Sequence, residues 1–197
     1  MDTRELETAL RGSLGGLVRY WGVFSSDDVG VMKLPLTRER GIIFIVNTLE
    51  STSDINNVGH WVCFHVSQSP KRQVVFFDSY GIDPEVYGRH FSSFFKINSS
   101  FTLYTFKRQI QPDLSYKCGL YVLFFIHSIS HHGIKHTLAR MKSTFSSVDL
   151  HRNDRWVVRY YFTNLRRRGT CGEWRSGVKR AITYSECLRG GGTGMSM

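Results

Sequence analysis

A near-continuous apolar segment over residues 118–131 constrains the fold of this chain more than any other feature. A Cys-Gly pair opens the segment, and Leu, Tyr, Val, Phe and Ile then follow one another with few interruptions. The run is too long for an ordinary strand, so it predicts a buried helix that ends at Gly133. A helix that is apolar on all sides needs neighbours on all sides, so we expect it at the centre of a domain.

Shorter patterns predict the elements around this helix. β-branched and aromatic runs predict strands over residues 41–47, 60–66, 73–78 and 100–106. Helical spacing of apolar residues, with Pro84 at one start, predicts helices over 3–14, 84–96 and 149–165. The expected class is α+β, as a single domain with a small central mixed β-sheet flanked by helices. We assign residues 1–165 to this domain and 166–197 to a basic, Gly-rich, partly disordered extension.

The charge of the chain is strongly positive and uneven. Lys and Arg number 26 against 16 Asp and Glu, a net charge of +10, and residues 151–197 hold 10 of the basic and 3 of the acidic residues. Phosphate backbones attract clustered Lys and Arg whatever the base sequence, so this balance suits a nucleic-acid partner. A solvated basic surface that binds nothing accounts for the same numbers.

The cysteines and the hydropathy pattern limit the cellular compartments in which we expect the chain. The four cysteines stand at 63, 118, 171 and 187 with no Cys-x-x-Cys pair, which favours free thiols in a reducing compartment. The first residues are charged, so we expect no secretory signal, and no apolar run reaches the ~20 residues of a membrane span. Histidines at 127, 131, 132 and 136 have no acidic or Cys partner nearby in sequence, so we expect no metal site.

Four chemically able residues stand in order at the boundaries of predicted elements. His60 opens a strand, Asp78 ends the next strand, Gln111 lies in a loop, and Cys118 begins the buried helix. Taken singly, each is more often structural: a buried cysteine is usually a small hydrophobe, and an Asp before a turn usually caps it. The ordered set of four is what indicates function.

The set fits nucleophilic catalysis by a thiol. A helix N-terminus and a nearby imidazolium both lower the pKa of a cysteine, which favours the thiolate of Cys118. Strand ends that meet at one sheet edge would let Asp78 orient His60 as the base. The Cys118 amide and the Gln111 side chain could donate to an oxyanion, and Gly119 would leave access beside the sulfur.

These motifs resemble a known clan of cysteine proteases. Gly-His-Trp at 59–61, and Gln111 followed by Cys-Gly-Leu-Tyr at 118–121, are similar to the clan that joins adenovirus endopeptidases with SUMO-deconjugating proteases. Segments 20–24, 44–48, 77–81 and 150–153 resemble stretches of the adenovirus branch, so that the likeness runs from about residue 3 to 165. Asp stands at position 78, where the adenovirus branch has Glu.

The resemblance implies roles for the site residues. Cys118 is the expected nucleophile, His60 its base, Asp78 the orienting acid and Gln111 the oxyanion donor. Trp61 and Gly119 are expected to border the substrate cleft. For Trp61, a plain core aromatic residue is an equally good interpretation.

The resemblance also implies a biological role. The chain would be a viral endopeptidase that cleaves capsid and core precursor proteins at Gly-Gly or Gly-X-Gly sites during virion maturation. We would expect it in the virion and host nucleus, as a monomer without metal or small-molecule cofactor and without membrane contact. Viral double-stranded DNA is the expected activator, with Arg166, Arg167 and Arg168 as candidate contacts.

The resemblance also bears on activation by a peptide and on cleavage of the chain's own C-terminal segment. Human adenovirus enzymes bind a short basic peptide through a disulfide, but residues 99–110 contain no cysteine here, so either a non-covalent peptide or no activating peptide at all is expected. Residues 165–171 resemble such a peptide and raise the hypothesis of a built-in activator; a solvated helix end is the plainer interpretation. Leu188-Arg189-Gly190-Gly191 fits the cleavage pattern, which predicts self-trimming after Gly191, although a flexible tail also explains it.

Two alternative functions remain at this stage. One is a deubiquitinase or SUMO-type isopeptidase of the same clan, which would also act at a Gly-Gly end. The other is a catalytically inactive DNA-binding module, which the charge alone would explain. The intact set of His60, Asp78, Gln111 and Cys118 favours an enzyme, because a binding module needs none of it.

Overall fold

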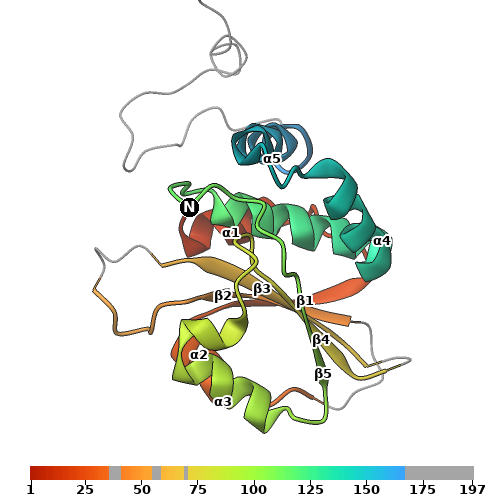
Figure 1. Ribbon diagram of the computed structural model, residues 1–197. Helices are drawn as coiled ribbons and strands as arrows, with labels where there is room; N and C mark the ends of the chain where they lie inside the picture. Colours follow the sequence, from red (N-terminus) through yellow and green to blue (C-terminus); the bar gives the residue numbers. More distant parts are fainter. Residues whose placement is uncertain (36–40, 55–58, 69–70, 167–197) are drawn as a thin grey trace, which may run out of the picture. The chain divides into compact units, whose positions relative to one another are not determined.

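Five strands form one mixed sheet in which neighbours in sequence are neighbours in space (Figure 1). They are β1 (Val18–Phe24), β2 (Gly41–Asn47), β3 (Trp61–Ser67), β4 (Gln73–Phe77) and β5 (Thr102–Thr105). The two outer pairs run parallel, and β2–β3 and β3–β4 run antiparallel. This computed structural model describes residues 1–35, 41–54, 59–68 and 71–166, which belong to one compact unit, Met1–Arg166.

Helices cover both faces of the sheet, as Figure 1 shows. On one face lie α1 (Thr3–Leu10), α4 (Cys118–Thr144) and α5 (Leu150–Asn164), and on the other lie α2 (Ser26–Gly30) and α3 (Arg89–Ile97). Successive strand residues point to opposite faces. In β2, Ile43 and Ile45 therefore join the core beneath α4, whereas Phe44 joins the core beneath α3. The predicted α+β fold, with a mixed sheet between helices, is confirmed.

Helix α4 is the buried central helix that the sequence predicts, but it is longer. Its side chains from Tyr121 to Ile126 are fully buried. Gly133 has φ 76°, which interrupts the helix where its end was predicted. A helical conformation resumes after Gly133 and ends at Thr144. There the Arg108 guanidinium donates to the carbonyls of Lys142 and Phe145, at 3.1 and 2.6 Å, and so caps the helix end. Within the described residues, no helix combines the length and apolarity that crossing a bilayer requires.

Other boundaries differ from prediction where glycine changes the backbone. The helix expected over 84–96 is a 3-10 turn, η1 (Pro84–Tyr87), followed by α3, because Gly88 between them has φ 100°. Helix α1 ends at Leu10 instead of residue 14, just before Gly12 with φ 71°. Strand β1 and helix α2 were not predicted at all. Gly22 in β1 has φ 132° and sits at a register shift, which interrupts the alternation that marks a strand.

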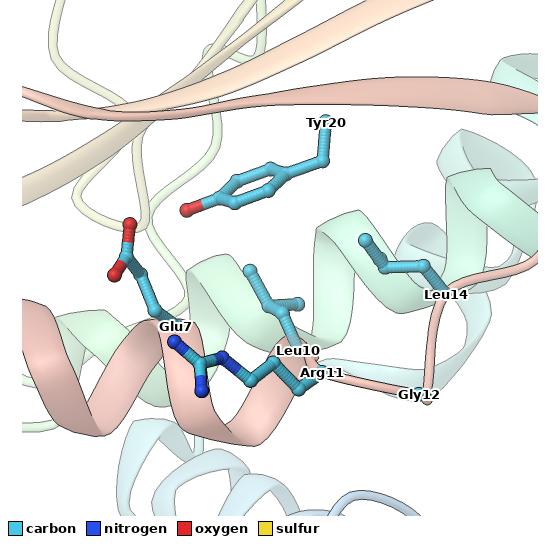
Figure 2. Close-up of a pocket in the computed structure, with 6 residues that line it drawn as sticks. All are labelled: Glu7, Leu10, Arg11, Gly12, Leu14 and Tyr20. Atoms are coloured by element: carbon cyan, nitrogen blue, oxygen red, sulfur yellow. The ribbon is translucent and has the colours of Figure 1, made fainter.

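A small cavity of about 320 Å³ lies between α1 and β1 (Figure 2). The Tyr20 ring lies across it, with its hydroxyl toward Glu7. This oxygen is buried and has no hydrogen-bond partner among the described residues. Burial raises the pKa of Tyr20, and the charge of Glu7 adds to the effect. The phenol therefore stays neutral.

The core also holds a buried histidine, His65. His65 on β3 is buried, and its Nδ1 finds no partner in the part of the chain that the structure describes. Gly41 on the neighbouring strand makes room for it, since a Cβ there would lie 2.8 Å from His65 Nε2. Burial lowers the pKa of His65 to about 4, because a charged imidazolium would lose its hydration.

This histidine should make the fold sensitive to acid. In the unfolded chain its pKa is near 6.5, so between pH 6.5 and 4 the unfolded state binds a proton that the folded state does not. The free energy of unfolding should therefore fall as the pH drops, by about 3 kcal/mol from this residue. In His65→Leu this component should vanish when unfolding by urea is measured at pH 7, 5.5 and 4. Equal pH slopes in both proteins would contradict it.

Candidate active site

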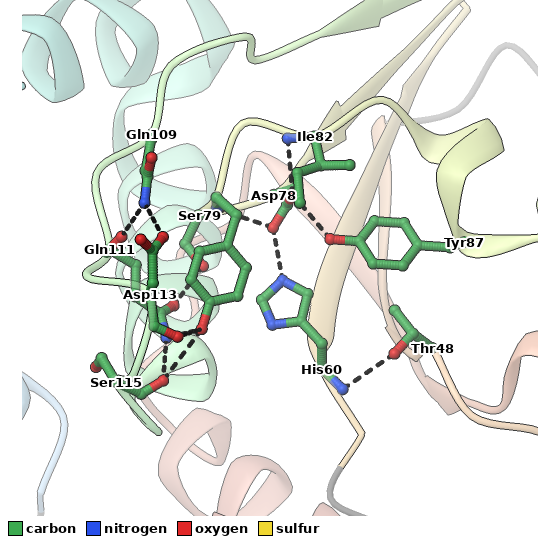
Figure 3. Close-up of polar contacts among 11 residues, drawn as sticks. Thr48, His60, Asp78, Ser79, Ile82, Tyr87, Gln109, Gln111, Asp113 and Ser115 are labelled. Atoms are coloured by element: carbon green, nitrogen blue, oxygen red, sulfur yellow. Dashed lines mark hydrogen bonds and ion pairs between the residues drawn. The ribbon is translucent and has the colours of Figure 1, made fainter.

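A buried carboxylate, Asp78, organises the candidate site at the end of β4 (Figure 3). Its side chain is 0% exposed, and four donors surround it. His60 Nε2 lies 2.6 Å from Oδ1, and the Tyr80 amide donates to the same oxygen at 3.0 Å. The Ile82 amide and the Tyr87 hydroxyl donate to Oδ2, at 2.9 and 3.0 Å. These bonds replace the water that burial removed.

His60 lies immediately before β3 and is held from several sides. Its backbone amide donates to the Thr48 hydroxyl at 3.0 Å, and its carbonyl accepts from the Thr48 amide at 2.9 Å. The imidazole lies between two tyrosine rings, Tyr80 at 4.7 Å and Tyr87 at 5.9 Å between centroids. With Nε2 bound to Asp78, Nδ1 is the ring nitrogen that remains for the thiol.

Cys118 is the first residue of α4, and its thiol lies close enough to His60 for the imidazole to act on its pKa. Burial raises the pKa of Cys118, but the hydrogen bond and charge of His60 outweigh it, and the backbone amides of Trp61 and Gly119 assist. The net result is a lowered pKa, to which the positive end of α4 contributes in the same direction. The other described cysteine, Cys63, is buried in β3, and burial alone raises its pKa.

The pKa of His60 shifts in the opposite direction to that of Cys118. Burial lowers the pKa of His60, but the hydrogen bonds and negative charges of Asp78 and the Cys118 thiolate raise it to about 9. Both shifts favour transfer of the thiol proton to the imidazole. The structure therefore brings His60, Asp78 and Cys118 together, with the carboxylate orienting the imidazole.

Gln111 lies in the same cluster, fully buried and fully hydrogen-bonded (Figure 3). Its Oε1 accepts from the Ser79 hydroxyl at 2.6 Å, and its Nε2 donates to the Ser115 carbonyl at 2.6 Å and the Tyr80 hydroxyl at 3.1 Å. The opposite amide orientation would set two carbonyl oxygens against each other at Ser115, so this assignment is the favourable one. Both amide hydrogens are thus in use in this conformation.

The turn after β4 explains how Gln111 reaches the site. The Ser79 carbonyl accepts from the backbone amides of Ile110 and Gln111, at 2.9 and 3.1 Å. Gly81 has φ 71°, and a Cβ there would lie 2.6 Å from the Arg108 backbone. The segment that carries Asp78 therefore also anchors the Gln111 loop, and only glycine allows the two to pack so closely.

The two residues predicted to border a substrate cleft have packing roles. Trp61 is buried in the core beneath α4, and its indole nitrogen donates to the Met1 carbonyl at 2.9 Å. Gly119 is buried as well, and a Cβ there would lie 2.9 Å from the Met1 sulfur and 3.3 Å from Leu6. The missing side chain at Gly119 thus lets the N-terminal segment approach α4, instead of leaving open access to the sulfur.

Two residues of the site escaped the sequence analysis. Tyr80 and Tyr87 enclose the imidazole, and one binds Gln111 while the other binds Asp78. Tyr80 stands in the quoted segment 77–81, two residues after Asp78, which was the available signal. Tyr87 stands nine residues after Asp78, and only the fold of η1 brings it back.

The remaining candidates lie elsewhere. His127 pairs with the Tyr160 hydroxyl and His131 with the Ser13 carbonyl, and within the described ranges no three His, Cys, Asp or Glu side chains form a group that could hold a metal. Arg166 lies over the Phe162 ring at 5.1 Å. Arg167 and Arg168, the segment 165–171 beyond Arg166, and the Gly191 cleavage point lie outside the described residues.

Comparison with known proteins gives remote structural likenesses only. The pS273R protease of ASFV aligns with a TM-score of 0.45 and 15% identity, over 75% of this chain and 60% of that chain. The central domain of the uncharacterized Lpg1148 protein from Legionella pneumophila aligns with a TM-score of 0.45 and 14% identity, over 82% of this chain and 98% of that chain. This chain therefore spans 60% of the length of the first structure.

No family model matches the sequence, and no curated protein matches it. Because both structural likenesses are remote, the interpretation of the site rests on the geometry of its own residues.

The site predicts selective reactivity of one cysteine. At neutral pH iodoacetamide should alkylate Cys118 and leave Cys63 unmodified, because His60 stabilises the first thiolate and burial suppresses the second. His60→Gln should slow alkylation of Cys118 about tenfold or more, as its pKa returns toward that of a free thiol. Peptide mass mapping over time measures both rates. Equal rates for Cys118 in the two proteins would mean that His60 does not activate the thiol.

Proposed function

We propose that this chain is a cysteine endopeptidase that hydrolyses peptide bonds through an acyl-enzyme. The observation that carries the proposal is the joined set of His60, Asp78 and Cys118, with opposite pKa shifts on the thiol and the imidazole. Structural ion pairs also shift pKa values, but a thiol at a helix start beside an oriented imidazole is the arrangement that nucleophilic catalysis needs.

The reaction follows from the positions of these groups. The Cys118 thiolate attacks the carbonyl carbon of the scissile bond, and the carbonyl oxygen becomes an oxyanion. The imidazolium of His60 gives its proton to the amine nitrogen, the C–N bond breaks, and an acyl-thioester remains on Cys118. Neutral His60 then takes a proton from water, hydroxide attacks the thioester, and the thiolate is regenerated. Asp78 holds the imidazole in the right tautomer and stabilises its positive charge.

Gln111 is proposed as an oxyanion donor together with the backbone amide of Cys118. To donate to an oxyanion, the Gln111 amide must release one of the two groups to which it now donates, the Tyr80 hydroxyl or the Ser115 carbonyl. The longer bond, 3.1 Å to the Tyr80 hydroxyl, is the one to release, because the hydroxyl keeps its own donation to the Ser115 carbonyl at 3.2 Å. A modest side-chain shift on substrate binding would therefore complete the oxyanion site.

The finer assignment rests on the sequence resemblance. We infer a viral endopeptidase acting on capsid and core precursors at Gly-Gly or Gly-X-Gly sites during virion maturation, located in the virion and host nucleus and working as a monomer. The net charge of +10 supports stimulation by viral DNA. A short basic peptide that binds without a disulfide would be a second activator. No metal or small-molecule cofactor enters this chemistry.

A second candidate function uses the same residues. A deubiquitinase or SUMO-type isopeptidase would run the identical acyl transfer on a Gly-Gly carboxyl end. The two differ in whether DNA changes the rate, because only the viral assignment invokes a polyanion. An inactive DNA-binding module would show no turnover at all.

The first test is cleavage of a fluorogenic Leu-Arg-Gly-Gly peptide by the full chain and by Cys118→Ala, with and without duplex DNA. We expect turnover that vanishes in Cys118→Ala and rises with DNA. Thermal unfolding of both proteins provides the control for folding. Turnover that DNA leaves unchanged favours the isopeptidase. No turnover in any condition, with Cys118 inert to iodoacetamide, refutes the peptidase assignment.

The pH dependence of this cleavage should be bell-shaped. On the acid side the rate rises as Cys118 becomes thiolate, and on the alkaline side it falls near pH 9, as His60 loses the proton that the leaving amine needs. In Asp78→Asn the carboxylate that raises the pKa of His60 is gone, so the alkaline limb should move to lower pH and the maximum rate should drop. An alkaline limb at the same pH in both proteins would mean that Asp78 does not set the pKa of the catalytic histidine.

A further inference from the structure

A second feature adjoins the nucleophile and has no part in the chemistry above. A hollow of about 620 Å³ lies between the loop of residues 112–117, which leads into Cys118, and residues 148–154 at the start of α5. We call it the acidic hollow; it is lined by Pro112, Asp113, Leu114, Ser115, Tyr116, Lys117, Val148, Asp149, Leu150, His151 and Asp154. Its volume is that of a site for one or two amino-acid side chains.

Apolar side chains on this hollow are exposed to an unusual degree. Val148 is 92% exposed, Leu114 is 90% and Tyr116 is 81%. These are the three most exposed large hydrophobic residues in the described part of the chain, and all three line the same hollow. Exposed apolar groups that gather at one place with a polar surround mark a binding surface more often than scattered ones do.

The charge of the hollow is opposite to that of the chain. Lys117 Nζ lies 3.2 Å from the Asp154 carboxylate, which also accepts from the Tyr121 hydroxyl at 2.9 Å. The charges of this ion pair therefore compensate each other. Asp113 accepts from the Gln109 amide and Asp149 from the Arg152 amide, and both stay exposed to solvent. Asp149 also lies 3.9 Å from the exposed guanidinium of Arg155, a weak surface pair that an incoming cation can replace. With three carboxylates and one ammonium, the lining carries −2 on a chain of net +10.

Two residues that line the hollow are direct neighbours of the proposed catalytic residues. The Ser115 carbonyl accepts from the Gln111 amide at 2.6 Å, and Lys117 directly precedes Cys118. A polypeptide whose scissile bond lies at Cys118 would therefore pass this surface within a few residues, since each extended residue spans about 3.3 Å.

We propose that the acidic hollow is a specificity subsite that takes a Lys or Arg side chain of the cleaved polypeptide next to an apolar residue. This rests on the proposed peptidase function and adds a selection rule to it. Asp113 and Asp149 attract the positive head group, and the exposed apolar side chains cover its aliphatic stem and the neighbouring residue. Phosphate-rich partners are disfavoured at this face by the same two carboxylates.

The test compares Asp113→Asn/Asp149→Asn with the unmodified chain on a chymotryptic peptide mixture, with cleavage sites read by mass spectrometry. Asn at 113 still accepts from Gln109, and Asn at 149 still caps α5, so each change removes charge and keeps the local bond. Asp27→Asn/Asp28→Asn is the matched control. It removes two carboxylates on α2, on the opposite face of the sheet, and keeps one acceptor oxygen at each position.

The unmodified chain and the α2 control should both enrich Lys or Arg at one fixed distance from the cut, beside an apolar residue. In Asp113→Asn/Asp149→Asn the ratio of Lys and Arg to Gln at that position should fall about fivefold, the effect of one to two partly exposed ion pairs. Absence of enrichment in the unmodified chain overturns the proposal. An equal loss at all sites, with the ratio unchanged, overturns it too.

A binding measurement separates this inference from catalysis. A fluorescent Leu-Arg-Leu-Arg peptide and its Leu-Glu-Leu-Glu counterpart are titrated against Cys118→Ala, alone and combined with Asp113→Asn/Asp149→Asn. Tighter binding of the basic peptide, lost in the combined variant, supports the subsite even if no bond is ever cleaved. Equal affinity for both peptides rejects the subsite, and leaves the peptidase assignment to be judged by turnover alone.

Discussion

The buried carboxylate of Asp78 is the interaction on which the rest of the site depends. A carboxylate without water is costly unless donors replace its hydration, and here four donors do so. Two are backbone amides of the turn that follows β4, so the turn and the charge stabilise each other. The other two are the imidazole of His60 and the hydroxyl of Tyr87, which the carboxylate thereby fixes in place. The same turn carries Ser79, whose contacts hold the Gln111 loop.

The lowered pKa of Cys118, the proposed nucleophile, results from a balance of opposing effects. Burial of Cys118 favours the neutral thiol, and the hydrogen bond and charge of His60 favour the thiolate more strongly. The packing of α4 fixes this balance, because its first two turns are locked in the core between the sheet, α1 and α5. A thiolate on a rigid helix start, facing an imidazole held between two tyrosine rings, needs little rearrangement to react.

The charge of the acidic hollow is opposite in sign to the net charge of the chain. The chain as a whole is basic, which suits attraction to a polyanion over long distances. Beside the nucleophile the sign reverses, and exposed apolar side chains accompany the carboxylates. A polypeptide with a basic and an apolar residue fits such a face, whereas nucleic acid does not.

The sequence by itself determined the features that local patterns encode. Alternating and continuous apolar runs located β2, β3, β4 and α4, because burial acts on each residue where it stands. The order and element boundaries of His60, Asp78 and Cys118 were equally visible. Boundaries set by a single glycine were missed: the break at Gly88 and the register shift at Gly22 depend on backbone angles that hydropathy does not report.

Only the tertiary structure decided what the side chains do. Tyr87 joins the site because η1 folds back toward β4, and Gly119 serves the packing of Met1 and Leu6 because α1 crosses the start of α4. The hydrogen bonds of Gln111 and the gathering of Asp113, Val148 and Asp149 around one hollow join segments far apart in the chain. Such contacts arise from the packing of whole elements against one another, so no local pattern in the sequence records them.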